Sequence, residues 1–177
     1  MNAGKKFEAA IKKSTPTECL YYRIDDSTGT FSGGANLRFS AKQPCDAFIF
    51  NAPRGVLFAV EMKSTKSSSI SFEDWRTDEK QPAKMIHKHQ ILSLLHFSKY
   101  ENVVAGFLFN FRNEVDGIEH TYFQTADDFV SMADEIKKCS FNEHDIQKAR
   151  HIEVVGKKMR VNYTWDLSHV LNMRKGI

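Results

Sequence analysis

The segment VLFAVEMKST, residues 56–65, decides the fold. Side chains alternate between the two faces of a strand, and here both faces begin with apolar residues. The two faces are Val56, Phe58, Val60 and Met62 on one side, and Leu57, Ala59, Glu61 and Lys63 on the other. Such a strand is typical of a sheet covered by helices on both sides. One face nevertheless ends in a carboxylate and an ammonium, so the segment predicts a core strand that also presents charged groups.

Composition indicates one soluble globular domain spanning residues 1–177. The chain is 41% hydrophobic and 27% charged, and it contains no apolar run long enough to cross a bilayer. The cysteines at 19, 45 and 139 form no zinc-ligand pattern. They are typical of a reducing interior, so we expect a cytoplasmic protein without a membrane partner. The net charge of +3 is a weak sign of an anionic partner.

The neighbouring segments predict an α/β fold with a mixed central sheet flanked by helices. DAFIFNA (46–52), PRG (53–55) and the opening segment predict a hairpin, and NVVAGFLFNF (102–111) predicts a buried central strand. Further strands are expected at 19–24, 119–125 and 158–164. Helices are expected at 2–14, 82–100 with Pro82 in the first turn, 126–139, 142–150 and from Trp165 onward. Residues 25–45 and 64–81 are expected to be loops.

The hairpin brings Asp46 to the same end of the sheet as Glu61 and Lys63. Two carboxylates a few Å apart repel each other, so one must be protonated or a cation must lie between them. Mg²⁺ prefers oxygen ligands, uses few carboxylates and keeps several waters. A lysine beside such an ion can act on an attacking water or on developing charge. The pattern therefore favours phosphodiester hydrolysis.

Simpler interpretations of these residues stay open at this point. Glu61 and Lys63 alone could form a surface ion pair worth about 0–1 kcal/mol. Glu8 lies on the apolar stripe of the first helix, where it could join the site or pair with Lys5 or Lys12. Gln90 is polar within an apolar helical row, and it could serve the site or make an ordinary helix–sheet hydrogen bond.

The ordered motifs resemble the RecU-like Holliday-junction resolvases of the PD-(D/E)xK nuclease superfamily. The similarity covers most of residues 2–130. The matching segments are NAGKKFEAAIKKST (2–15), RFSAKQPCD (38–46), CDAFIF with VLFAVEMK (45–50, 56–63), EMKSTKSSSISF (61–72), IHKHQI (86–91), and VVAGFLFNF with HTYFQTADDF (103–111, 120–129). The resemblance implies a restriction-endonuclease-like core.

The resemblance also implies the chemistry and the partner. Asp46 and Glu61 would ligate Mg²⁺ or Mn²⁺, Lys63 would act on the water or the transition-state charge, and Glu8 and Gln90 would complete the site. The family acts as a homodimer that nicks a four-way junction symmetrically and inserts a stalk into its centre. Here the stalk region, about 25–45, is shorter, Cys45 replaces a frequent threonine, and the loop after Lys63 is longer. These departures bear on junction selectivity.

Contacts with the DNA backbone would use basic side chains around this site and would make binding salt-dependent. Ordinary solvated surface is the alternative for each of them, and Phe39 could either wedge at a branch point or anchor a loop. His87 and His89 are not expected to share a helix face. The proposed DNA contacts are Lys12, Arg38, Phe39, Lys42, Lys66 and His87.

The sequence thus favours a metal-dependent, structure-selective DNA endonuclease that resolves four-way junctions. A PD-(D/E)xK nuclease of another role, such as restriction or mobile-element DNA processing, is the first alternative. A catalytically inactive protein that binds DNA or modulates recombination is the second.

Overall fold

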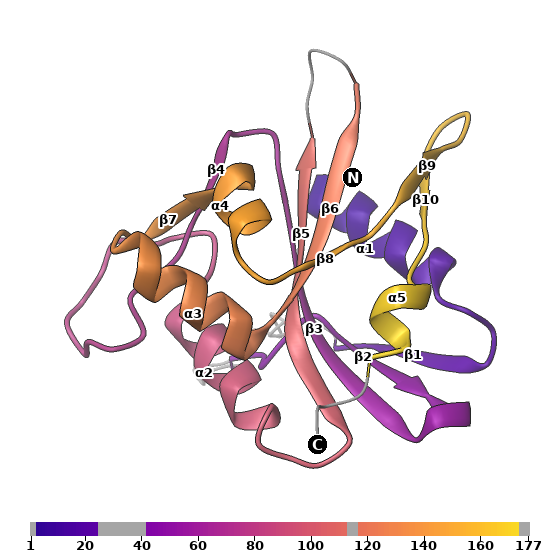
Figure 1. Ribbon diagram of the computed structural model, residues 1–177, viewed down its shortest axis with the longest axis horizontal. Coiled ribbons are helices and arrows are strands. Elements are labelled where there is room, and N and C mark those ends of the chain that lie inside the picture. Colours follow the sequence, from indigo (N-terminus) through magenta and orange to yellow (C-terminus); the bar gives the residue numbers. More distant parts are fainter. Residues whose placement is uncertain (1–2, 25–41, 113–116, 174–177) are drawn as a thin grey trace, which may run out of the picture.

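The computed structural model describes residues 3–24, 42–112 and 117–173 (Figure 1). Its centre is a six-stranded sheet with the order β1-β2-β3-β5-β6-β8. β3 and β5 are parallel and the other neighbours are antiparallel. The strands are β1 (Cys19–Arg23), β2 (Ala47–Asn51), β3 (Val56–Thr65), β5 (Val103–Arg112), β6 (Glu119–Thr125) and β8 (Ile152–Glu153). The expected α/β fold with a mixed central sheet is confirmed.

Helices cover both faces of the sheet, as the two apolar faces of β3 predicted. Figure 1 shows α1 and α5 on one side and α2, α3 and α4 on the other. The helices are α1 (Ala3–Ser14), α2 (Lys88–Phe97), α3 (Ala126–Ile136), α4 (Glu143–Lys148) and α5 (Ser168–Leu171), with a 3₁₀ turn, η1 (Ala52–Arg54). Two small ladders complete the fold: β4 (Ser69–Ser71) with β7 (Ser140–Asn142), and β9 (Gly156–Lys158) with β10 (Tyr163–Trp165).

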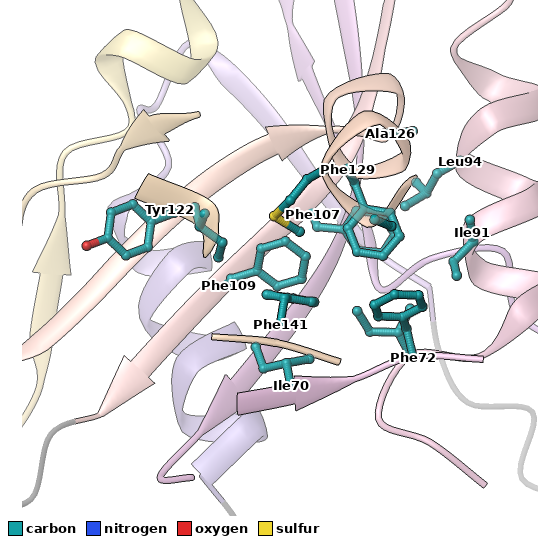
Figure 2. Packing of buried hydrophobic residues seen from close by; sticks show 14 of the residues in the cluster. Ile70, Phe72, Ile91, Leu94, Phe107, Phe109, Tyr122, Ala126, Phe129 and Phe141 are labelled. Carbon is teal, nitrogen blue, oxygen red and sulfur yellow. The ribbon is translucent and has the colours of Figure 1, made fainter. Parts of the chain in front are cut away.

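The sheet separates two hydrophobic clusters. On the α1 side, Phe7 and Ile11 pack with the β3 face that carries Phe58 and Val60. On the α2–α3 side, aromatic rings dominate (Figure 2), and the Phe107 ring lies 4.7 Å from that of Phe129 between centroids. Burying such large apolar side chains is the main favourable term in folding. Because β3 contributes to both clusters, its position is fixed from both sides.

The hairpin β2–β3 sets the register that matters for the site. Ala47 pairs with Val60, and the Asp46 amide donates to the Val60 carbonyl at 3.1 Å. The ladder therefore ends beside Glu61, and Asp46 immediately precedes it. Gly55 closes the turn with a φ of 65°, a left-handed conformation that glycine adopts at little cost.

The helix expected at 82–100 is shorter in the structure, where α2 spans only Lys88–Phe97. α2 begins at Lys88, so Pro82 is not in its first turn. The Ile86 amide donates to the Ser71 carbonyl at 3.0 Å, and its carbonyl accepts from the Glu73 amide at 2.9 Å. This bridge to the strand-like segment Ser71–Glu73 occupies backbone groups that a helix would need. The distant partner therefore overrides the local helical pattern.

Other boundaries also differ. The expected loop 64–81 contains the end of β3 and all of β4. The strand expected at 158–164 is a hairpin, β9–β10, and the last helix begins at Ser168 rather than Trp165. Most of the loop or stalk expected at 25–45 lies outside the described residues. In the described ranges, no helix has the length and apolar character needed to cross a membrane.

Candidate active site

The centre of the site is a pair of carboxyl groups on adjacent strands. Asp46 immediately precedes β2, and Glu61 follows the Val60 of β3 that pairs with Ala47. The two carboxyl groups are hydrogen-bonded to each other, which raises the pKa of Glu61 and lowers that of Asp46. Asp46 Oδ2 also accepts the backbone N–H of Met62 at 2.7 Å. The predicted proximity of Asp46 and Glu61 is thus present in the structure.

Glu61 is the most unusual group in this pair, because only 1% of it is exposed. Burial raises its pKa to about 8, against the lowering effect of Lys63 and together with the raising effect of Asp46. Burial likewise raises the pKa of Asp46, despite the Met62 N–H and Lys63, which lower it. Glu61 Oε2 is buried, and no donor group in the described part of the chain reaches it. A proton or a cation is needed to satisfy that oxygen.

Lys63 and Gln90 both bind the other oxygen of Glu61. Lys63 Nζ lies 2.7 Å from Glu61 Oε1, and Gln90 Nε2 donates to the same atom at 2.6 Å. The Lys63 side chain is 17% exposed, so the Glu61–Lys63 pair is not the solvated surface pair considered from sequence. Gln90 Oε1 accepts the His87 N–H at 2.9 Å, which locks the amide at the start of α2. Gln90 therefore holds Glu61 in place by a helix–sheet hydrogen bond.

Glu8 forms an ion pair that the sequence did not predict. Its carboxylate pairs with Arg23 of β1 at 3.1 Å, and the side chain is 18% exposed. The Tyr21 hydroxyl is buried with no hydrogen-bond partner among the described residues. Burial, and the negative charges of Glu8 and Asp46, raise the pKa of Tyr21 to about 12. Tyr21 and Arg23 each interact electrostatically with Asp46 as well as with Glu8, so they connect the two carboxylates. Neither residue was singled out from the sequence.

A signal for those two residues was present in the strand pattern. Tyr21 and Arg23 alternate with exposed Leu20 and Tyr22, so they share the face of β1 that turns toward α1. Polar groups on an inward face need partners. The partner of Arg23 is 15 residues away in sequence, and only the fold identifies it.

A cationic pocket lies at the start of α2, the helix whose Gln90 binds Glu61, and is lined by Lys42, Glu73, His87, Lys88, His89 and Leu92. The imidazole rings of His87 and His89 stack with 5.6 Å between centroids, although they were not expected to share a face. The reason is that His87 precedes the helix in an extended conformation. Burial and the nearby charges of Lys42 and His87 lower the pKa of His89.

Glu73 organises one wall of this pocket. His87 Nδ1 lies 2.9 Å from Glu73 Oε1, and the Lys88 N–H donates to Oε2 at 2.7 Å. Burial raises the pKa of Glu73, but these hydrogen bonds outweigh it and hold that pKa below its ordinary value. The Glu73 carboxylate consequently fixes His87 at the mouth of the pocket, while Lys42 is exposed.

The other proposed DNA contacts are more scattered. Lys12 is exposed in the last turn of α1, and Lys66 is exposed just after β3. Arg38 and Phe39 lie outside the described residues. The structure therefore gathers Lys42 and His87 in the cationic pocket, places Lys66 just after the strand that carries Glu61, and leaves Lys12 on a separate helix.

Comparison with known proteins gives one clear relative of uncharacterised function. No family model matches it. It is 35% identical over 181 residues to the SPbeta prophage-derived uncharacterized protein YotM of Bacillus subtilis (strain 168), and the match covers 94% of this chain and 84% of that protein. The chain belongs to the YotM family. Because the match to YotM spans nearly the whole chain, it includes the region from Asp46 to Gln90.

The residues of this YotM family member suit a hard divalent cation. Within residues 3–24, 42–112 and 117–173, no three His, Cys, Asp or Glu side chains form a group able to hold a metal. Asp46 and Glu61 nevertheless supply two carboxylates, and Mg²⁺ is commonly held by one or two carboxylates together with water and phosphate oxygens. The unsatisfied Oε2 of Glu61 is the position that a cation would neutralise.

Proposed function

We propose that this chain is a metal-dependent, structure-selective DNA endonuclease that resolves four-way junctions as a homodimer. The proposal includes a restriction-endonuclease-like core with Asp46, Glu61 and Lys63 as its reactive set. One observation carries it: two carboxyl groups are forced together at a buried strand, with one oxygen left unsatisfied and a lysine alongside. A structural ion pair has no need for the second carboxylate, whereas a cation site does.

Each residue of the set has a task that its contacts support. Asp46 and Glu61 would hold Mg²⁺ or Mn²⁺, which would supply positive charge beside the scissile phosphate and acidify a water molecule. Lys63 is partly exposed, so its ammonium can reach a phosphate oxygen or the water that attacks it. Gln90 keeps the Glu61 carboxyl in one orientation. Glu8 and Arg23 form an adjacent pair that supports the region around Tyr21 and Asp46.

The cationic pocket suits the backbone of the substrate. Lys42 and His87 line the pocket at the start of α2, the helix whose Gln90 binds Glu61, and can contact phosphates near the bond that is cut. Neutral His89 would stack on His87 and keep its ring oriented. The path of the strand would then run from this pocket across Lys63.

A second candidate function is processing of mobile-element DNA by a nuclease that is not selective for junctions. The B. subtilis relative is a prophage-derived protein, which favours a role on phage DNA. Phage DNA offers both branched intermediates and linear duplexes as substrates. The same carboxyl pair would serve either role, so the two functions differ only in the DNA structure that the protein cuts.

The test is a cleavage assay on an immobile four-way junction and a linear duplex of matching sequence, with Mg²⁺ or Mn²⁺. Paired symmetric nicks confined to the junction support the proposal, and duplex cleavage supports the second candidate. The Asp46→Asn variant should be inactive, whereas Asp127→Asn, at an exposed position on α3, should match the wild type. Junction binding without any cleavage would leave the chain as a DNA-binding protein and refute both enzyme functions.

A further inference from the structure

The hairpin β9–β10 carries a concentration of positive charge that the proposed active site does not use. Lys157, Lys158 and Arg160 lie within four residues, and residues 156–163 contain no acidic side chain. All three are exposed, and none has an ion-pair partner in the described part of the chain. Met159 and Val161 alternate with them and are 52% and 84% exposed. A solvated surface loop does not require large apolar groups at these positions, so the tip has the composition of a binding element.

The base of the hairpin is fixed rigidly to the core. Trp165 is 2% exposed, meets the Phe7 ring edge-on at 5.8 Å, and donates its backbone N–H to Ser14 Oγ at 2.9 Å. The Tyr163 ring stacks on Trp165 at 5.2 Å, and its hydroxyl donates to the Gly117 carbonyl at 2.9 Å. These contacts bind the hairpin to α1 and to the start of β6. The charged tip is therefore presented in a defined place.

A pocket of about 280 Å³ lies between this hairpin, α1 and the adjoining ends of β5 and β6. Its lining includes four cations and one carboxylate: Lys6, Arg112, Lys158, Arg160 and Glu119. The Glu119 carboxylate accepts from the Asn110 amide at 3.2 Å. An excess of positive charge in a concave site attracts anions and is the usual footprint of a phosphate-binding surface.

This pocket adjoins the end of the strand that carries Lys63. Arg112 Nε donates to Ser64 Oγ at 3.0 Å, and Ser64 Oγ donates to Asn110 Oδ1 at 2.6 Å. β3 and β5 are parallel and pair Lys63 with Phe109 and Ser64 with Asn110. The pocket beside hairpin β9–β10 and Lys63 therefore lie at the same end of the sheet, on its two faces.

From this arrangement we propose that hairpin β9–β10 and Arg112 form a second DNA contact, which binds backbone phosphates away from the bond that is cut. The proposal rests on the nuclease function for its choice of DNA as the anion. Lys157 and Arg160 at the tip would contact phosphates, and Met159 and Val161 would lie against sugars or base edges. β-ribbons of this kind bind in DNA grooves, and apolar side chains on them pack against exposed base steps.

The test measures DNA binding by fluorescence anisotropy with the Glu61→Gln variant, which allows binding without cleavage. In this background Lys157→Ala/Arg160→Ala is compared with Lys80→Ala/Lys99→Ala, two exposed lysines remote from the hairpin. Removing two phosphate contacts should lower the slope of log K against log salt by about 1.8 and weaken binding on the order of 10-fold at low salt. The control pair should change neither quantity. Far-UV circular dichroism should be unchanged for both, since the side chains removed are exposed.

The outcomes separate this proposal from the proposed function. If wild type cleaves DNA but the hairpin variant binds with the affinity and salt slope of the control, the hairpin proposal is wrong and the nuclease function stands. If wild type binds DNA without cleaving it, and the hairpin variant loses affinity and slope, the hairpin proposal stands and the nuclease function fails. Absence of DNA binding by the wild type would overturn both.

Discussion

Replacing Glu61 by glutamine should stabilise the protein at neutral pH when divalent cations are removed with a chelator. Folding raises the pKa of Glu61 from 4.5 to about 8. A raised pKa means that the stabilising contribution is complete below pH 4.5 and is lost as the pH rises toward 8. Holding the proton at pH 7 therefore costs the folded state ~3 kcal/mol. Glutamine resembles the protonated acid and removes this cost at every pH.

The measurement is thermal unfolding of the wild type and Glu61→Gln between pH 4 and pH 8. The free energy of unfolding of Glu61→Gln should rise relative to that of the wild type by about 1.4 kcal/mol per pH unit through this window. At pH 7 the gain relative to pH 4 corresponds to roughly 6–12 °C in Tm for a chain of this size. Glu79→Gln, at an exposed carboxylate, controls for the loss of one negative charge. A difference between Glu61→Gln and wild type that stays constant from pH 4 to pH 8 would refute the account of a buried, protonated carboxyl.

Three further predictions follow from the same contacts. Mg²⁺ or Mn²⁺ at about 100 times its Kd should stabilise the wild type by about 2.7 kcal/mol in a melting experiment, and a similar gain in Asp46→Asn would contradict the assignment of that ligand. Gln90→Ala should lower the rate of DNA cleavage roughly 10–100-fold, because Glu61 loses its anchor, while DNA affinity in a binding assay stays the same; a parallel loss of affinity would instead mean that α2 had moved. Gly156→Ala should destabilise the fold by about 1–3 kcal/mol in denaturant unfolding, since a Cβ there would lie 2.4 Å from the Trp165 ring, and an unchanged midpoint would show that the hairpin base is loosely packed.

The sequence predicted the structure best where the residues of one segment are enough to determine its secondary structure and burial. The two apolar faces of residues 56–65 predicted a strand covered on both sides, and the turn at 53–55 predicted the hairpin that sets Asp46 against Glu61. The site lies on that hairpin, so its central pair was within reach of local reasoning. The uniformly apolar run at 102–111 likewise identified β5, the neighbour of β3 in the sheet.

Local patterns failed where a distant segment decides the structure. Ile86 belongs to a helical pattern, but its backbone pairs with the segment around Phe72, which a single-segment argument cannot foresee. Arg23 as a partner of Glu8 depends on how α1 crosses β1. The stacking of His87 on His89 depends on where α2 begins. In each case the helix or strand was recognisable, and its partner was not.

The contact between Asp46 and Met62 has a consequence for the behaviour of the protein in solution. β2 begins at Ala47, while β3 continues past Glu61 to Thr65 beside β5, so the sheet narrows at this point. The Asp46 side chain accepts the Met62 N–H that a longer β2 would have bound through its backbone. Met62 is 6% exposed, so this N–H group would have no partner in the buried part of β3 if the Asp46 side chain were replaced by an apolar one. The acid that organises the site thereby also satisfies the backbone of β3 at the point where β2 ends, and a variant without this acceptor should be less stable.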